Sequence, residues 1–572
     1  MQRFRMLMIG WVGLWVWMGQ VLACQEEVDL TAQLEDSMSL LGGYGFSGTV
    51  LVAMDGEVLL HRGYGWARRD PVVAMQPETR FPVASISKQF TAAAVLKLEE
   101  EGKLRASDPI SRHLDGVAED KESITIRQLL SHTSGLPFEC GGRPDSMQAL
   151  LQCLWQAPPG EPGQAQYSNA GYALLAHLVE QVSGQPFKQF VRSRLFQPAA
   201  MSESGFIDEP QRFAQGQVAY QYTWNVEHGT EIGSGLNWNL RGSADVVTTA
   251  GDLLRWERAL TSGKILKADA LKKLLQGDGE PGTAAGSGYG WQTDPGGQVQ
   301  RAGGTFALGF NAVLRRYPSR KAVAVVLSNQ NYGLLMPTPL VAETVENLLM
   351  GRPPADLPQA AAPPEDLLQQ CAGDYQIEDG GRLQVEAFAG NLLISVQGQP
   401  AVNWLTVRSA PEARQLQAYT DRALELADAL EKRRFGQIAE ILGLDEGAEA
   451  RTETLYRGWI EGLEDGQGQL QSVQVAGTIP QGESSRTYLR LTFEKGSQVR
   501  RLRWLGQDLV SIVPGALPLL PTHFRLLSGD KLAGFHLAYG RAVELRIMRD
   551  AEGRVSGLEL SGPDGKLVAL RR

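Results

Sequence analysis

Apolar positions in the first 350 residues follow two different spacings. Short apolar runs at residues 50–54 and 58–61 flank Asp55-Gly56, which predicts a β-hairpin because glycine tolerates the positive φ of a tight turn. Apolar residues recur at helical spacing over residues 86–96 and 174–182, and a last short apolar run at 322–327 predicts another strand. Strands at both ends with helices between them predict an α+β fold, in which an antiparallel sheet is flanked by helices and one half is all-helical.

The pattern changes after a stretch rich in proline and alanine. Residues 351–365 lack periodicity and are predicted to form a linker. Beyond it, residues 383–396 have the pattern of a hairpin, and residues 416–430 carry the apolar stripe of a helix. Alternating apolar and polar residues at 489–494 and 543–547 predict half-buried strands. The predicted division is a domain at 30–350, the linker at 351–365 and a β-rich C-terminal region at 366–572.

Composition and charge exclude several classes of protein. Hydrophobic residues make up 43% of the 572 and charged residues 21%, which is typical of globular domains. The 55 Lys and Arg against 64 Asp and Glu give a net charge of −9, and no clustered basic face suggests nucleic acid as a partner. The seven histidines include no HExxH pair and the four cysteines no CxxC, so we expect neither a metal site nor a cofactor.

The N-terminus predicts export. Arg3 and Arg5 precede an apolar run at residues 6–18, so residues 1–23 have the features of a secretory signal peptide. The run is shorter than the roughly 20 residues of a membrane-spanning helix. Residues 21–24 (VLAC) also resemble a bacterial lipobox, in which Cys24 is lipidated after cleavage. Two interpretations stay open: a periplasmic protein, or an outer-membrane lipoprotein tethered to the membrane through Cys24.

Export would place the remaining cysteines where a disulfide can form. In an oxidising compartment, Cys140 and Cys153 are candidates for a disulfide that closes a short loop. Two separate buried thiols are the alternative, because spacing in the sequence does not fix the distance between Cα atoms. Cys371 has no histidine near it in the sequence, and we expect it to be an inert buried thiol.

Candidate chemistry begins at Ser85-Ile86-Ser87-Lys88. These residues lie where an extended segment meets a predicted helix, and Ser85 and Lys88 are one helical turn apart, so they share a face. A serine hydroxyl is a poor nucleophile at neutral pH and needs a neighbour to take its proton. A lysine whose pKa is lowered by burial meets that need. The spacing alone is a weak signal, because it also recurs by chance.

Further motifs give the pattern specificity. They appear in this order: residues 81–91 (FPVASISKQFT), 129–137 (LLSHTSGLP), Tyr167-Ser168-Asn169, 249–253 (TAGDL), 289–291 (YGW) and Asn329. With these motifs, residues 30–350 resemble the serine β-lactamase superfamily, in particular class C β-lactamases and the related penicillin-binding DD-peptidases and esterases. The resemblance implies a β-lactamase/transpeptidase-like fold and no cofactor.

The resemblance also implies roles for individual residues. Ser85 is expected to attack a carbonyl and form an acyl-enzyme, while Lys88 and Tyr167 manage the protons. Asn169 is expected to bind substrate and the lysine. A phenol near an ammonium group has its anionic form favoured, so Tyr167 is interpreted as a usable base. His132, within the LLSHTSGLP run, is expected to be a packing and turn residue.

The third motif of the family departs from its usual form. A Lys-Thr-Gly or His-x-Gly strand is expected shortly before a Gly-Phe pair, and this chain has RAGGTFALGF at residues 301–310. Aligning on Gly303 puts Arg301 at the cation position, whereas aligning on Gly309-Phe310 leaves no cation there. Arg301, Gly303 and Gly304 are therefore the candidate substrate-binding residues of this strand.

The C-terminal region looks like an auxiliary β-rich domain, a small barrel. About residues 408–515 look like an inserted α+β cone of the nuclear-transport-factor type. No catalytic constellation is evident there, so an unknown binding partner is the default interpretation.

The functional prediction is an exported serine hydrolase acting on an ester or amide. Its expected substrate is a small molecule or peptide, such as a peptidoglycan-derived or D-amino-acid peptide or a small ester. Two alternatives stay open: a catalytically weak or silent penicillin-binding-like receptor or sensor, and a true class C-like β-lactamase.

Overall fold

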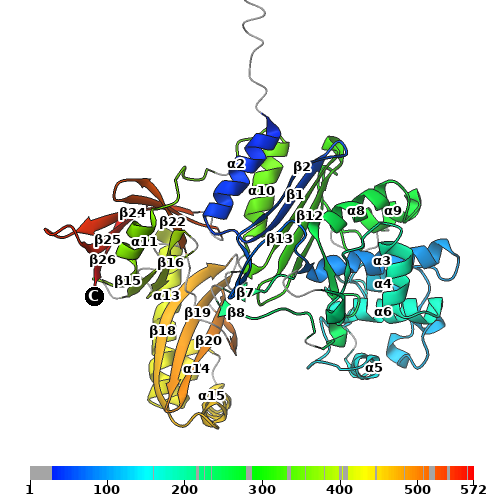
Figure 1. Ribbon diagram of the computed structural model, residues 1–572. Helices are drawn as coiled ribbons and strands as arrows, with labels where there is room; N and C mark the ends of the chain where they lie inside the picture. The colour runs from blue at the N-terminus through cyan, green and yellow to red at the C-terminus, as the bar shows by residue number, and fades with distance from the viewer. Residues whose placement is uncertain are drawn as a thin grey trace, which may run out of the picture.

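The structure is a computed structural model of the 572-residue chain (Figure 1). It describes residues 29–158, 160–213, 218–223, 226–233, 235–277, 287–331, 336–354, 356–378, 381–388, 390–398, 402, 410–444, 447–481, 484–506, 508–514, 522–537, 541–562 and 565–572. The predicted signal peptide at 1–23 and the lipidation candidate Cys24 lie outside the described residues. No helix in the described ranges is long and apolar enough to cross a bilayer.

A six-stranded antiparallel sheet organises the first domain. Its strands, in spatial order, are β10 (Gln292–Thr293), β11 (Gln300–Thr305), β12 (Asn311–Tyr317), β13 (Ala322–Ser328), β1 (Gly48–Met54) and β2 (Glu57–Tyr64). The predicted β1–β2 hairpin is confirmed, with Asp55 at φ +50° and Gly56 at φ +88° in its turn. The first strand, β1, pairs along its length with β13, so the two ends of this domain meet inside one sheet.

Helices cover both faces of this sheet (Figure 1). Val50 and Val52 of β1 point into a core shared with α2 (Leu30–Gly43) and α10 (Thr338–Leu349). Leu51 and Ala53 alternate to the other face and join the core of the helical half. The sheet is therefore buried on both sides, and its far face positions the helices that carry the candidate site.

The all-helical half surrounds one central helix, α3 (Ser87–Glu100). Every residue from Ser87 to Leu96 is buried, as expected for a helix enclosed by others. The surrounding helices are α4 (Ile126–Leu130), α5 (Met147–Gln156), α6 (Asn169–Ser183), α7 (Phe187–Val191), α8 (Ala250–Thr261) and α9 (Ala268–Gln276). Gly184 ends α6 in the left-handed conformation, the capping role that glycine suits best.

Small sheets connect these parts. Their strands are β3 (Trp66–Arg69) with β4 (Val72–Ala74), β5 (Phe81–Pro82) with β9 (Val246–Thr248) and β6 (Gly205–Phe206), and β14 (Gln330–Asn331) with β7 (Tyr222–Thr223) and β8 (Val226–Glu227). Of these, the β5–β9 pair lies directly before the Ser85 segment and fixes its path.

The C-terminal region forms a closed barrel, at the left of Figure 1. Its strands are β15 (Gly373–Ile377), β16 (Arg382–Phe388), β17 (Asn391–Gln397), β22 (Thr522–Ser528), β23 (Lys531–His536), β24 (Arg541–Arg549), β25 (Val555–Gly562) and β26 (Gly565–Arg571), preceded by helix α11 (Glu365–Cys371). The predicted linker contacts both neighbours: Tyr44 donates a hydrogen bond to Pro358 O (2.8 Å), and Ala361 exchanges backbone hydrogen bonds with Leu526 of the barrel (2.9 and 2.8 Å).

An α+β unit is inserted between barrel strands β17 and β22, at the bottom of Figure 1. It contains α13 (Ala410–Glu431), α14 (Ile438–Leu442), α15 (Glu449–Glu464), β18 (Leu470–Gln481), β19 (Ser484–Phe493), β20 (Gly496–Leu505) and β21 (Asp508–Pro514). Leu489, Leu491 and Phe493 of β19 are buried against α13, as their alternation predicts. The fold class is thus confirmed, and the predicted domain boundaries stay a prediction.

Candidate active site

The chain reaches Ser85 through a short, constrained turn. Strand β5 is paired with β9, and the 3-10 turn η1 (Ala84–Ile86) leads from it into α3. Ala84 has φ +45°, a conformation that costs a non-glycine residue about 1 kcal/mol or more and recurs at functional sites. Ser87 anchors the start of α3, because its Oγ accepts a hydrogen bond from Val246 N–H (3.0 Å). Ser85 is thereby presented, half-buried, ahead of the first turn of α3.

Lys88 contacts Ser85 as their spacing predicts. Its Nζ lies 3.2 Å from Ser85 Oγ, 2.7 Å from Asn169 Oδ1 and 3.0 Å from the backbone oxygen of Ser243. Only 1% of Lys88 is exposed. The amine is therefore held by two acceptors and directed at the hydroxyl.

Burial changes the protonation of this amine. It lowers the pKa of Lys88 to about 7, and the carboxylates of Glu139 and Asp245 only partly offset it. A large fraction of Lys88 is consequently neutral at neutral pH, as a general base requires.

Tyr167 makes the second contact with the hydroxyl. Its OH lies 2.7 Å from Ser85 Oγ, and its ring packs 4.7 Å from Lys88 Nζ. Although 44% of the residue is exposed, burial of the hydroxyl raises its pKa, and the hydrogen bond with Ser85 only partly offsets this. Burial therefore favours the protonated phenol, whereas the nearby lysine was expected to favour its anionic form. The lowered pKa of Lys88 agrees with the expected base, an amine whose pKa burial lowers.

The ring of His132 packs against the ring of Tyr167. The two rings stack with centroids 4.3 Å apart, and His132 Nδ1 accepts a hydrogen bond from Ser168 N–H (3.1 Å). Burial, reinforced by the charge of Lys88, lowers the pKa of His132 to about 3, so the ring is neutral at physiological pH. His132 has φ +60°, which agrees with its predicted role in a turn.

Asn169 is the first residue of α6, and its amide is occupied at both ends. Oδ1 accepts from Lys88 Nζ (2.7 Å), and Nδ2 donates to Glu139 Oε1 (2.7 Å). The predicted contact with the lysine is present. Asn169 is only 8% exposed, and its amide keeps one hydrogen and one oxygen lone pair for the predicted contact with substrate.

Strand β11 forms another side of the site around Ser85. Gly304 is the residue of β11 that lies closest to the η1 turn. A Cβ added at Gly304 would lie 2.1 Å from Val83 O and 2.8 Å from Ser85 N, whereas at Gly303 the nearest atom would be a backbone oxygen at 3.6 Å. Only glycine allows this approach at 304. The alignment that treats Gly303 as the motif glycine is therefore wrong by one residue, because spacing alone does not show which of two glycines touches the turn.

This register also changes the position assigned to Arg301. Gln300, Ala302 and Gly304 are buried on the face towards Ser85, and Arg301 alternates to the exposed face. The position two residues before the contacting glycine thus belongs to Ala302, which has no charge. Arg301 still lines the mouth of the cleft, at its rim.

A cleft of about 590 Å³ joins these residues. Its lining includes Ser85, Lys88, Tyr167, Arg301 and Gly303 from the predicted site, together with Ser131, His132, Ala165, Gln166, Ser287, Gly288, Gly290, Trp291, Gln292, Ala302, Val313 and Arg315. Asn169 and Gly304 lie behind this surface. In the ranges that the structure describes, no group of three His, Cys, Asp or Glu is placed to hold a metal ion.

Sequence reasoning missed two partners of Lys88. Glu139 follows the LLSHTSGLP run after one residue, and Ser243 contributes only a backbone oxygen. Neither has a local signal, since both reach Lys88 through tertiary packing. Trp291 of the YGW motif is buried and lines the cleft.

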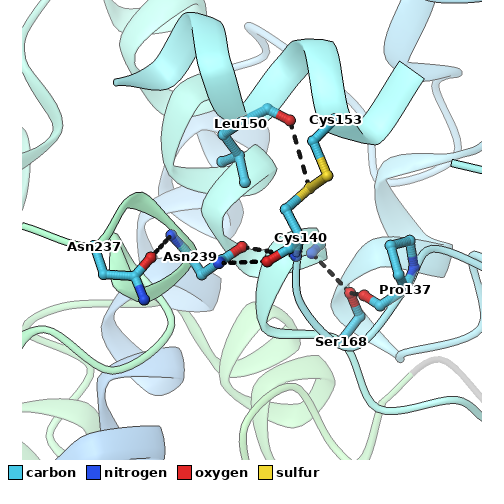
Figure 2. Close-up of a disulfide and its surroundings, with 8 residues drawn as sticks. Pro137, Cys140, Leu150, Cys153, Ser168, Asn237 and Asn239 are labelled. Carbon is cyan, nitrogen blue, oxygen red and sulfur yellow. Dashed lines mark hydrogen bonds between the residues drawn. A yellow bond between two sulfur atoms is a disulfide. The ribbon is translucent and has the colours of Figure 1, made fainter. Parts of the chain in front are cut away.

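The disulfide candidate is present. Cys140 and Cys153 are joined, and Figure 2 shows the bond linking the segment after Pro137 to α5. Cys371 is buried, and burial raises the pKa of its thiol to about 11, in agreement with an inert thiol.

The fold and the cluster of Ser85, Lys88 and Tyr167 agree with the resemblance to the serine β-lactamase superfamily, and comparison with known proteins shows the family. The family model described as Beta-lactamase matches residues 31–342. The chain belongs to this β-lactamase family, whose members include serine hydrolases.

Individual relatives are penicillin-binding-protein-like. Penicillin-binding protein 4* of Bacillus subtilis (strain 168) is 29% identical over 392 residues, covering 62% of this chain and 84% of that protein. The crystal structure of a penicillin-binding protein from Bacillus halodurans is 27% identical and covers 54% of this chain and 99% of that one, with a TM-score of 0.47. An octameric penicillin-binding protein homologue from Pyrococcus abyssi is 17% identical and covers 94% and 99%, with a TM-score of 0.49.

Proposed function

We propose that the protein is an exported serine hydrolase that cleaves an ester or amide through an acyl-enzyme on Ser85. The observation that carries this proposal is the double contact on one hydroxyl. Lys88 Nζ and Tyr167 OH both lie within hydrogen-bond distance of Ser85 Oγ, at 3.2 and 2.7 Å, in a cleft of about 590 Å³. Nucleophile, base and a second proton carrier thus meet where a substrate can enter.

In the proposed acylation step, Lys88 is the base. A neutral amine has two hydrogens, which it donates to Asn169 Oδ1 and to Ser243 O, so its lone pair faces Ser85 Oγ. Ser85 Oγ attacks the carbonyl carbon as its proton passes to Lys88 Nζ. The carbonyl oxygen becomes an oxyanion, and the backbone N–H of Ser85 is one donor for it, a contribution of about 3–4 kcal/mol in other hydrolases.

Tyr167 completes the cycle. When the tetrahedral intermediate collapses, the bond to the leaving group breaks and the neutral phenol gives that group its proton. The proton on Lys88 then restores the phenol. In deacylation a water molecule attacks the carbonyl carbon of the acyl group and gives a proton to Lys88 Nζ. The ester bond to Ser85 Oγ then breaks, Ser85 Oγ takes a proton from Tyr167, the proton on Lys88 restores the phenol, and the acid product leaves. The raised pKa of Tyr167 suits a donor of protons.

The cleft's charges indicate an anionic substrate. Three basic residues line it: Lys88 is close to neutrality and is held by Ser85 and Asn169, and Arg315 is paired with Glu346 (2.8 Å). Arg301 is exposed, and its guanidinium has no hydrogen bond or ion pair with any residue that the structure describes. A guanidinium binds a carboxylate in a bidentate manner. We therefore propose a substrate with a free carboxylate at the rim, such as a peptidoglycan-derived or D-amino-acid peptide.

Arg301→Ala should raise KM selectively for substrates with the carboxylate. For these substrates KM is expected to rise about tenfold, because one charge-assisted hydrogen bond contributes about 1.5 kcal/mol. Paired substrates, one a free acid and one its methyl ester, provide the measurement. Equal KM changes for both would show that Arg301 does not bind the carboxylate.

Cys24→Ser tests the proposed membrane tether. If Cys24 is lipidated, wild-type protein partitions into detergent and carries an acyl mass, and the variant moves to the soluble fraction. Several acyl chains hold a protein firmly at the membrane, whereas a single chain binds only weakly. A wild-type protein that is soluble, with an unmodified N-terminal Cys24, would favour ordinary signal-peptide cleavage.

Hydrolysis itself is tested with a panel of p-nitrophenyl esters, D-amino-acid amides, D-Ala-D-Ala peptides and a chromogenic β-lactam. We expect turnover of at least one ester or amide by the wild-type protein and none by Ser85→Ala. Turnover that is unchanged in Ser85→Ala would reject the proposed function. Specific binding of these compounds without turnover would support a silent receptor instead.

A further inference from the structure

Glu139 fixes the orientation of the amide that faces the catalytic lysine. A carboxylate can only accept hydrogen bonds, so Glu139 Oε1 must face the NH2 end of Asn169, at 2.7 Å. The amide oxygen then has to face Lys88 Nζ, also at 2.7 Å. With any residue that can donate at position 139, the amide is free to turn over and present its NH2 group to the amine. Glu139 therefore keeps the lysine's lone pair directed at Ser85.

The segment that carries Glu139 is held by hydrogen bonds and by a disulfide on the residues beside it. Pro137 O accepts a hydrogen bond from Ser168 Oγ (2.6 Å), and Phe138 O accepts from the N–H groups that open α6, at 2.8 and 3.2 Å. Cys140 N–H donates to Asn239 Oδ1 (3.0 Å), and its carbonyl accepts from Asn239 Nδ2 (3.1 Å), as Figure 2 shows. The Cys140–Cys153 disulfide adds a covalent tie to α5 on the residue directly after Glu139.

We propose that Glu139 is a positioning residue for Lys88, and that the Cys140–Cys153 disulfide holds it in place. This inference rests on the proposed hydrolase function. It makes the disulfide a part of the active-site framework, which acts on the lysine through Glu139 and Asn169, in addition to closing a loop.

Glu139 acts on Lys88 through its charge as well as through its hydrogen bond to Asn169. Lys88 is faced by the carboxylates of Glu139 and Asp245 and by the rings of Tyr167 (4.7 Å) and Tyr172 (5.5 Å). His132 is also near and is neutral.

The two carboxylates are not equivalent. Asp245 is neutralised by Arg241, whose guanidinium lies 2.8 Å from it. Glu139 has no ion pair with any other residue in the described part of the chain. Its negative charge therefore acts on Lys88 uncompensated, and it raises the pKa of that amine against the effect of burial.

Glu139→Gln is expected to move the acid limb of the pH profile of kcat/KM to lower pH by about one unit. The sign follows because loss of the negative charge lowers the pKa of Lys88, so the neutral, basic amine persists at lower pH. The plateau of kcat/KM should also fall, since a glutamine at 139 allows both orientations of Asn169. Glu57→Gln, the same change at an exposed glutamate of the β1–β2 hairpin, is the control and should leave the limb in place.

The disulfide is tested by Cys153→Ser alone and combined with Glu139→Gln. We expect Cys153→Ser to shift the acid limb in the same direction, and Glu139→Gln to have a smaller effect in that background than in the wild type. A lower Tm with an unchanged acid limb and additive effects would overturn the proposal, because a disulfide that only stabilises the fold does not move the limb. Should the variant fail to fold, wild-type protein treated with a phosphine reductant gives the same comparison.

Failure of the proposed function gives a different result. If wild-type protein shows no Ser85-dependent hydrolysis at any pH, the function is rejected. If hydrolysis depends on Ser85 but Glu139→Gln leaves the acid limb unmoved, the function stands and the positioning role of Glu139 is rejected.

Discussion

Ser85→Ala and Lys88→Ala should each reduce kcat by about 10⁴-fold or more, as removal of one member of a nucleophile–base pair does in other hydrolases. The physical reason is that the hydroxyl and the amine act as one unit across 3.2 Å. Without the serine no acyl-enzyme forms, and without the lysine no group with a pKa near neutrality takes the proton. Steady-state kinetics on the best substrate of the panel provide the measurement.

The double variant should lose little more than either single one, because the second substitution removes a group that has already lost its partner. Lys103→Ala, at an exposed lysine beyond the end of α3, is the matched control and should retain wild-type kinetics. A fully active Lys88→Ala, or losses that add in the double variant, would contradict the assignment of Lys88 as base.

Gly304→Ala should lower kcat/KM by about 10²-fold or more, the size of effect that a displacement of about 1 Å at a reacting group produces. The new methyl group would lie 2.1 Å from Val83 O, so β11 and the η1 turn must move apart and take Ser85 N–H with them. A lower Tm is expected as well, because overpacking at a buried contact costs about 1–3 kcal/mol. Kinetics and thermal unfolding of the same preparation measure both effects.

Gly303→Ala is the paired variant, one residue away on the same strand. Its methyl group would make only an ordinary van der Waals contact, with Ala312 O at 3.6 Å, so the Tm should stay at the wild-type value and any loss of kcat/KM should be much smaller than at 304. If the two variants behave alike, or if 303 is the more sensitive position, then Gly304 is not the residue of β11 that packs against the η1 turn.

A local pattern was sufficient to bring Ser85 and Lys88 together, and the family motifs were needed to assign the pair a role. Ser85 and Lys88 share a helical face by spacing alone, and the helical periodicity that starts at Ile86 predicts the helix itself. Tyr167 lies 82 residues further along the chain, and no spacing rule joins it to Ser85. Only the order of several motifs, through the family resemblance, indicated that it belongs to the same site.

The remaining parts of the site depend on tertiary structure. Glu139 reaches Lys88 across one side-chain amide, a contact that no local pattern encodes. The protonation of Tyr167 follows from burial of its hydroxyl, which the presence of a nearby lysine in the sequence does not reveal. Similarly, two adjacent glycines in β11 have the same propensities, and only the packing of η1 distinguishes 304 from 303.

The C-terminal region shows the same limit on a larger scale. Alternation correctly predicted individual strands, since Val543, Leu545 and Ile547 all point into the core. Closure of the barrel is a different matter, because β15 pairs with β26 across almost 200 residues. Periodicity describes which side of a strand is buried, and it carries no information on which strand lies beside it.

The most direct test of Ser85 as the nucleophile is to trap the acyl-enzyme and locate it. Wild-type protein is incubated with a fluorophosphonate and, separately, with a fluorescent penicillin, and the adduct is mapped by peptide mass spectrometry, with Ser85→Ala in parallel. We expect a stoichiometric fluorophosphonate adduct on Ser85 and none on the variant, whereas the penicillin arm shows only whether β-lactams are substrates. No adduct on Ser85 under either probe, or an adduct on another residue that persists in Ser85→Ala, would contradict the assignment of Ser85 as the nucleophile.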